Sequence, residues 1–112
     1  MAQDKKRREP VDVEPIRHGG LRYEAPRLGH PYGFEQDGGF VTARDEASGA
    51  LAWSQRIYLV EYGEDIEQDK QEVFIKALTL SDDGQALLVV NERGGRFRVG
   101  LTDRSVEALG RA

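Results

Sequence analysis

The two histidines of the sequence, His18 and His30, are the first candidates for chemistry, because imidazole is a common metal ligand. Both lie in turn-rich sequence, and carboxylates follow the second at Glu35 and Asp37. A two-histidine metal site could combine these groups. However, the separation of twelve residues lacks the short spacing that places two ligands on one element. We therefore predict no metal site and interpret both histidines as turn or surface residues.

An acidic segment after residue 62 holds the densest group of carboxylates, namely Glu64, Asp65, Glu67 and Asp69. Oxygen ligands at positions 65, 67 and 69 have the spacing with which a calcium loop begins. Lys70 stands where such a loop needs glycine, and the bidentate glutamate further along is missing. We expect a solvated hairpin loop of negative potential, which is a candidate docking surface for a basic partner.

Two groups of cations make nucleic acid an alternative partner. They are the N-terminal run Lys5, Lys6, Arg7 and Arg8, and the later group Arg93, Arg96 and Arg98. A domain that binds single strands presents aromatic side chains beside its basic ones. Phe97 alternates with the arginines of its segment and is therefore predicted to face the core, which argues against such a platform. The net charge of −4 gives no general attraction to nucleic acid or to an anionic membrane.

The remaining reactive side chains form no catalytic constellation. The absence of cysteine excludes disulfides, thiolate zinc sites and thiol nucleophiles. Ser48, Ser54, Ser81 and Ser105 have no neighbouring histidine in the sequence, and the glycine pairs lack the strand–loop–helix context of a phosphate cradle. We expect no catalytic residue and no cofactor. A weaker hypothesis is a small-ligand site lined by His30, Tyr32 and Trp53.

Strands joined by short turns must position these residues. Apolar alternation and β-branched residues predict strands at residues 21–24, 40–43, 51–62, 73–80, 86–90 and 96–101, and residues 105–109 form a last strand or a helical turn. Their regular spacing predicts an all-β antiparallel meander of about five to seven strands. Tyr32, Phe34 and Phe40 are expected to form a lid over one end of the sheet.

The 112 residues allow one domain at most. Residues 1–20 contain few apolar side chains, so we expect a flexible or extended N-terminal arm there and a single all-β domain over residues 21–112. No run approaches the roughly 18 apolar residues that span a bilayer, and no signal peptide is recognisable. The cytoplasm is therefore the expected compartment, with no membrane partner.

Two turn motifs resemble repeat units of β-propellers. The run Ala43-x-Asp45-x-x-Ser48-Gly49-x-x-x-Trp53 resembles the repeat of pyrroloquinoline quinone (PQQ) propellers, with Ser48 where threonine is usual and Ala50 where lysine is usual. The run Ser81-x-Asp83-Gly84-x-x-Leu87-x-Val89-x-Asn91 is similar to the hairpin of YVTN-type propellers. Independent use of common turn chemistry is the alternative explanation for both motifs.

The resemblance implies structural tasks and a blade-like sheet. It implies that Trp53 packs between blades and that five residues tie the turns, namely Asp45, Ser48, Gly49, Asp83 and Gly84. A propeller closes with four or more blades, whereas the predicted strands suffice for about one and a half, so no central channel for a quinone is expected. One blade leaves edges uncovered. Three solutions are open: the sheet curls into a small barrel or sandwich, the arm covers an edge, or two chains pair. We favour the curled sheet, with a homodimer as an additional form.

Together these observations favour a small, non-enzymatic β-module with a structural or protein-interaction role. Its partner would be an unknown protein or a second copy of the chain, with a homodimer as one form. The alternative function is nucleic-acid binding through the basic N-terminal arm and Arg93, Arg96 and Arg98.

Overall fold

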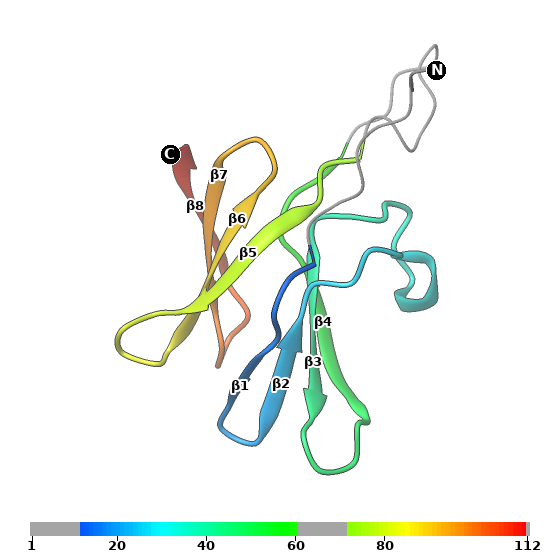
Figure 1. Ribbon diagram of the computed structural model, residues 1–112, viewed down its shortest axis with the longest axis vertical. Helices are drawn as coiled ribbons and strands as arrows, with labels where there is room; N and C mark the ends of the chain where they lie inside the picture. Colours follow the sequence, from blue (N-terminus) through cyan, green and yellow to red (C-terminus); the bar gives the residue numbers. More distant parts are fainter. Residues whose placement is uncertain (1–11, 61–71, 112) are drawn as a thin grey trace.

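The computed structural model describes residues 12–60 and 72–111, and these contain eight β-strands (Figure 1). The strands are β1 (Ile16–His18), β2 (Leu21–Glu24), β3 (Phe40–Asp45), β4 (Leu51–Arg56), β5 (Ile75–Leu80), β6 (Ala86–Asn91), β7 (Gly95–Gly100) and β8 (Val106–Arg111). They form two four-stranded antiparallel sheets in the orders β1-β2-β3-β4 and β5-β6-β7-β8. The all-β, antiparallel prediction is confirmed. The expected five to seven strands are corrected to eight in two sheets, and these do not close into a barrel.

The two sheets pack face to face through one apolar core. In β3, Val41 and Ala43 point into it, and in β6 Leu87 and Val89 do so, because alternate residues of a strand face the same side. These four residues are fully buried. The other buried members of the core are Tyr23, Ile57, Ile75, Leu78 and Val99.

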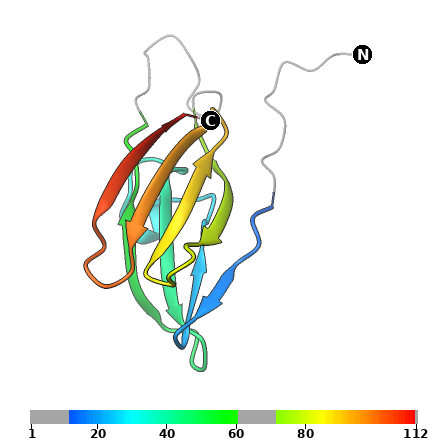
Figure 2. The same cartoon turned by 90° about the vertical axis from the view of Figure 1, so that its left-hand side faces the viewer.

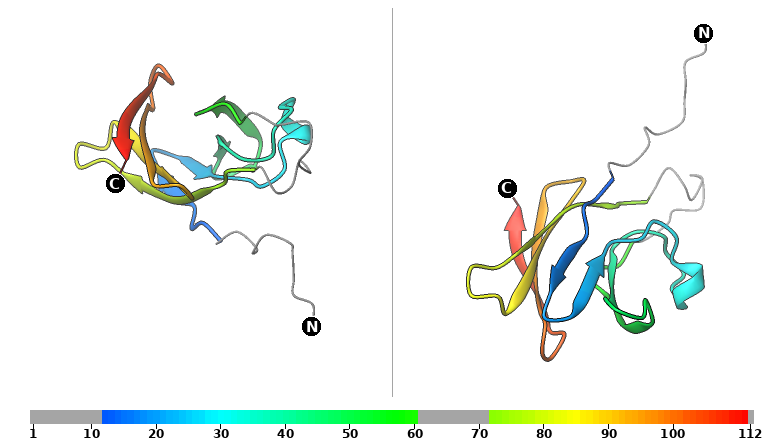
Figure 3. Two further views of the ribbon diagram at one scale, coloured as in Figure 1. Left: turned by 90° about the horizontal axis from the view of Figure 1, so that it is seen from above. Right: turned by 60° about the horizontal axis from the view of Figure 1, so that its bottom comes forward.

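The sheets lie closest at their first strands and diverge toward their last ones. Strand β1 contacts β5, whereas β4 and β8 form the outer edges of the two sheets (Figures 2 and 3). Two side-chain contacts span the diverging side. The Arg104 guanidinium lies over the Trp53 ring at 5.8 Å from its centroid, and Tyr58 stacks on Phe97 with ring centroids 5.2 Å apart.

Several element boundaries differ from the sequence-based expectations. Strand β4 ends at Arg56, although an apolar run continues, because the Ile57 and Tyr58 N–H groups donate to the Gly39 carbonyl instead of to a strand. Ile57 and Val60 are therefore buried in the connection between the sheets. The last segment is a strand, Val106–Arg111, and not a helical turn.

The N-terminal arm expected over residues 1–20 contributes a strand to the first sheet. Residues Ile16–His18 form β1 and pair with β2. The basic run at Lys5, Lys6, Arg7 and Arg8, and the acidic residues Glu64, Asp65, Glu67 and Asp69, lie outside the described residues. Within the described part of the chain, no helix is long and apolar enough to span a membrane.

Two buried polar side chains tie the loop between β2 and β3 to the segment that connects the two sheets. The Gln36 amide donates to the Gly38 and Tyr58 carbonyls at 2.7 and 2.8 Å, and its oxygen accepts from Val60 N–H at 3.0 Å. The Glu72 carboxylate accepts from the N–H groups of Asp37 and Gly38. These bonds satisfy backbone groups that no strand ladder reaches.

Candidate interaction surfaces

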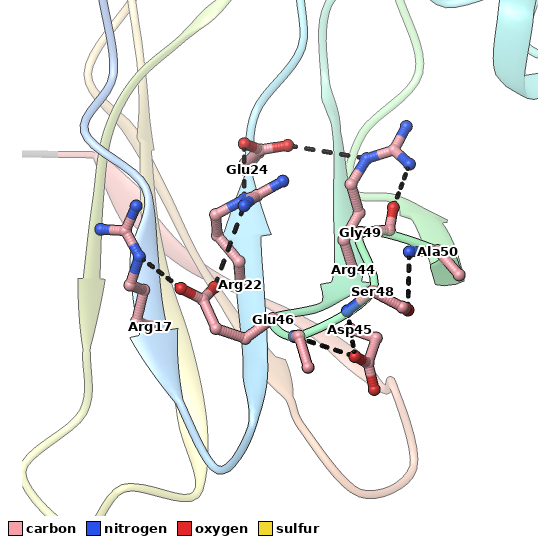
Figure 4. A network of polar contacts seen from close by, with 10 residues as sticks. Arg17, Arg22, Glu24, Arg44, Asp45, Glu46, Ser48, Gly49 and Ala50 are labelled. Carbon is pink, nitrogen blue, oxygen red and sulfur yellow. Dashed lines mark hydrogen bonds and ion pairs between the residues drawn. The ribbon is translucent and has the colours of Figure 1, made fainter.

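The first propeller-like motif forms the turn between β3 and β4. The Asp45 carboxylate accepts from Ala47 N–H at 2.9 Å and from Ser48 N–H at 2.8 Å, and Ser48 Oγ accepts from Ala50 N–H (Figure 4). These bonds hold the pKa of Asp45 below its ordinary value, with Ser48 as the main cause. Gly49 has φ of 79°, a conformation that favours glycine. The motif residues therefore stabilise the backbone of this turn.

The second motif forms the turn between β5 and β6 in a similar way. Ser81 Oγ donates to the Asp83 carboxylate at 2.6 Å, and Gln85 N–H donates to the same oxygen at 2.9 Å. The Ser81 bond is the main cause of the lowered pKa of Asp83. Gly84 has φ of 72° and lies beside the His18 ring of β1.

Trp53 lies on the inner face of β4 and packs within its own chain. Its ring contacts Tyr23 at a centroid distance of 5.9 Å and is covered by Arg104 from the second sheet. The side chain is half-buried. Tyr32, by contrast, contacts Phe40 and Arg44 on the other face of the first sheet. The small-ligand site expected from His30, Tyr32 and Trp53 is therefore not assembled.

The aromatic lid covers part of the outer face of the first sheet, the face turned away from the core. Tyr32 and Phe34 pack on Phe40 at centroid distances of 5.5 and 4.7 Å. A short 3-10 helix, η1 (His30–Tyr32), carries His30. Among the described residues, no three His, Asp or Glu side chains gather as a metal site would require. Asp37 instead accepts from Gly29 N–H, and Glu35 lines a cavity of about 400 Å³ with Arg56 and Val60.

The rest of that outer face carries a network of charged side chains (Figure 4). Arg17 and Glu46 form an ion pair at 2.9 Å, and Arg22 pairs with Glu24 at 3.0 Å. Arg44 lies 3.9 Å from Glu24 and donates to the Tyr32 hydroxyl and to the Gly49 carbonyl. We call this group the ion-pair face. Because its side chains are charged and partly exposed, the ion-pair face favours contact with water.

The free edge of the second sheet is strand β8. All six of its residues are exposed, and among the described residues it pairs only with β7. Val106 is 37% exposed and Leu109 is 40% exposed. Leu109 is skipped in the pairing with β7, and Gly110 beside it has φ of 96°, so this edge carries a bulge.

The predicted arginine surface is divided between two environments. Arg93 and Arg96 line a cleft of about 370 Å³ at the end of the second sheet, and Arg111 of β8 lines it as well. Arg98 does not line this cleft, and its charge acts on Asp83 and Asp103 instead. The floor of the cleft includes Phe97, which alternates with the arginines as predicted.

Two residues that shape this cleft, Tyr58 and Asn91, escaped the sequence-based site predictions. Tyr58 was assigned to a strand, but it stacks on Phe97 and donates to the Val73 carbonyl at 2.5 Å. Burial raises the pKa of Tyr58 far above its ordinary value, and nearby Glu92 and Glu72 add to the effect. Asn91 accepts from the Arg93 and Gly95 N–H groups and thereby shapes the turn. An asparagine before two glycines was the available signal for that turn.

Comparison with known proteins supplies no assignment: no protein-family model matches the chain, and no curated protein matches it.

Proposed function

We propose that this chain is a non-enzymatic structural and protein-interaction module that pairs with a second copy of itself along β8. The observation that carries this proposal is the exposure of β8 along its whole length at a sheet edge. An edge strand presents unpaired N–H and C=O groups, which a second strand can satisfy. Val106 and Leu109 add exposed apolar surface to that edge.

The apolar residue at the middle of β8 favours a second copy as the occupant, because Leu109 is 40% exposed on this edge. In an antiparallel pairing centred on Leu109, residues 107 and 111 lie opposite one another along the backbone, while the bulge places the Glu107 and Arg111 side chains on opposite faces of the sheet. The same pairing brings the two Leu109 side chains together. A twofold contact of this kind uses the same surface on both chains and closes at a dimer.

The propeller resemblance gives this module a structural interpretation. Each sheet is a four-stranded antiparallel meander in sequence order, and the first strands of the two sheets are adjacent, as in neighbouring propeller blades. A ring of several copies is the competing assembly. It would bury the ion-pair face against another sheet, and desolvating those charges is costly. Pairing at the edge leaves that face in water.

Size-exclusion chromatography with light scattering tests the proposal. The full chain is expected to have twice its 12.5 kDa mass at high concentration. Leu109→Lys introduces like charges at the centre of the pairing and should give a monomer. Leu28→Lys changes another leucine, 63% exposed and remote from β8 in the sequence, and should leave the dimer intact. A chain that stays monomeric at all concentrations contradicts the proposal, as does equal dissociation by both variants.

Binding to nucleic acid remains the second proposal, because Arg93 and Arg96 lie together on the cleft. A salt titration with mixed oligonucleotides tests it, since phosphate contacts weaken steeply as salt rises. No retention at low salt would exclude this function.

A further inference from the structure

The cleft beside Tyr58 concentrates positive charge in a chain whose net charge is −4. Its described lining holds three arginines, Arg93, Arg96 and Arg111, and no aspartate or glutamate. Guanidinium groups match the geometry of carboxylate and phosphate oxygens and can bind them through two parallel hydrogen bonds. The three guanidinium groups make this cleft a candidate site for an oxyanion, and the charges of Glu72 and Glu92, which also reach Tyr58, oppose them only in part.

An apolar wall stands beside these cations. Tyr58 and Phe97 stack with an interplanar angle of 24°, and Val73, Leu59 and Ala108 complete the wall. Aromatic and aliphatic side chains with a few charged groups are the usual lining of a small-molecule site. The volume of about 370 Å³ falls within the range of such sites.

Hydrogen bonds hold the lining in place without a ligand. The Asn91 side chain is buried, and its oxygen accepts from Arg93 N–H at 2.9 Å and from Gly95 N–H at 2.8 Å. The Tyr58 hydroxyl is fixed by its bond to the Val73 carbonyl. The turn that carries Arg93 and the ring that faces Phe97 are thus preorganised, which lowers the entropic cost of binding.

We propose that this cleft binds a small ligand in which a flat ring carries an oxyanion, such as an aromatic carboxylate or an aromatic phosphate. The oxyanion contacts Arg93 and also Arg111, which pairs with Gly95 and so lies on the same face of the sheet as Phe97, and the ring packs on the wall formed by Tyr58 and Phe97. The cleft is lined by the β6–β7 hairpin and by Ala108, Gly110 and Arg111 of β8 in the same chain, so the site needs no residue of a second copy.

NMR titration of the full, ¹⁵N-labelled chain tests the proposal with four probes: benzoate, phenyl phosphate, inorganic phosphate and benzyl alcohol. Benzoate or phenyl phosphate is expected to give saturable shifts at the amides of Gly95, Ala108 and Gly110. Inorganic phosphate lacks the ring and benzyl alcohol lacks the charge, so each should bind roughly tenfold more weakly. The ratio of the dissociation constants of benzoate and phenyl phosphate shows which oxyanion the arginines prefer.

Three arginine variants separate a specific site from general attraction. Arg93→Gln and Arg111→Gln should each weaken binding of the better aromatic anion by roughly tenfold, the loss of one charged hydrogen bond. Arg98→Gln is the matched control, because this arginine of β7 lies outside the cleft, and it should leave the affinity nearly unchanged.

Three results would overturn the proposal: no saturable shift into the millimolar range, equal binding of benzyl alcohol and the anions, or equal weakening by all three variants. Repeating the titration at protein concentrations at which the chain is monomeric separates this site from the proposed dimer, because Leu109 lies between the lining residues Ala108 and Gly110 and a substitution there would alter the cleft itself. Binding by the monomer supports the cleft alone, and binding only at concentrations that give the dimer contradicts its independence from the pairing.

Discussion

Replacing Gln36 by glutamate is expected to destabilise the fold more at neutral pH than at acidic pH, relative to Gln36→Leu. The Gln36 side chain is 4% exposed and lies between the β2–β3 loop and the segment that connects the two sheets. Its amide nitrogen donates to two carbonyl oxygens, and its amide oxygen accepts from Val60 N–H. The position therefore needs a donor on one side and an acceptor on the other.

Leucine removes both functions while keeping a similar volume. It leaves Val60 N–H and two carbonyl groups without their side-chain partner, which costs about 3–9 kcal/mol at a rate of about 1–3 kcal/mol per unsatisfied group. This cost does not involve a titrating group. It should therefore change little with pH.

Glutamate places a carboxylate oxygen against the carbonyls of Gly38 and Tyr58, so the folded state favours its protonated form. Its pKa in the folded protein is then raised above the unfolded value of about 4.3. Holding the proton at pH 7 costs up to about 3.7 kcal/mol, and at pH 4 only a few tenths of a kcal/mol. The protonated acid can still donate one hydrogen bond and accept another.

Urea denaturation of the wild type and both variants at pH 4 and pH 7 checks this expectation. The free energy of unfolding of Gln36→Glu should rise relative to Gln36→Leu by roughly 3 kcal/mol as the pH falls from 7 to 4. Comparing the two variants at each pH removes the titration of the other carboxylates. A difference between the variants that is independent of pH would refute the donor role of Gln36.

Other perturbations test the core and the turns. Thr42 is fully buried, and its hydroxyl has no hydrogen-bond partner among the described residues, so Thr42→Val should raise the free energy of unfolding by about 1 kcal/mol in urea denaturation. A Cβ on Gly38 would lie 2.6 Å from the Val73 carbonyl oxygen, so Gly38→Ala should lower the melting temperature, with a cost of about 1–3 kcal/mol. The turn bonds lower the pKa values of Asp45, Asp83 and Asp103, chiefly through Ser48, Ser81 and Ser105. Their stabilisation is present above the unfolded pKa and is lost as the pH falls through the folded values. Changing the three aspartates to alanine should therefore make the free energy of unfolding fall less steeply on acidification. Denaturation followed by circular dichroism at several pH values measures this slope.

Strands β2 to β7 were predictable because each has a local signal, whereas β1 falls in the expected arm and the last segment was left open as a strand or a helical turn. Alternation in Arg96, Phe97, Arg98 and Val99 places the aromatic residue inward, and the structure has it so. The Asp-Gly turn before Ala86 likewise marks a hairpin. Such patterns depend only on neighbours in the chain.

The break between the two sheets was not predictable from those signals. Residues 57–60 form an apolar run that is typical of a central strand, yet their backbone bonds go to Gly39 and Gln36. These partners lie in a polar, glycine-rich stretch without periodicity. The cleft was not predictable for the same reason, since it depends on the contact between Tyr58 in this connection and Phe97 in the second sheet.

The central claim, pairing along β8, is tested most directly by a cross-link at its proposed centre. The chain contains no cysteine, so Leu109→Cys introduces a single thiol. Opposite residues of paired antiparallel strands lie within reach of a disulfide. Mild oxidation should convert this variant to a covalent dimer, whereas Leu28→Cys should remain largely uncross-linked. Equal cross-linking of both variants, or none at position 109, would contradict pairing along β8.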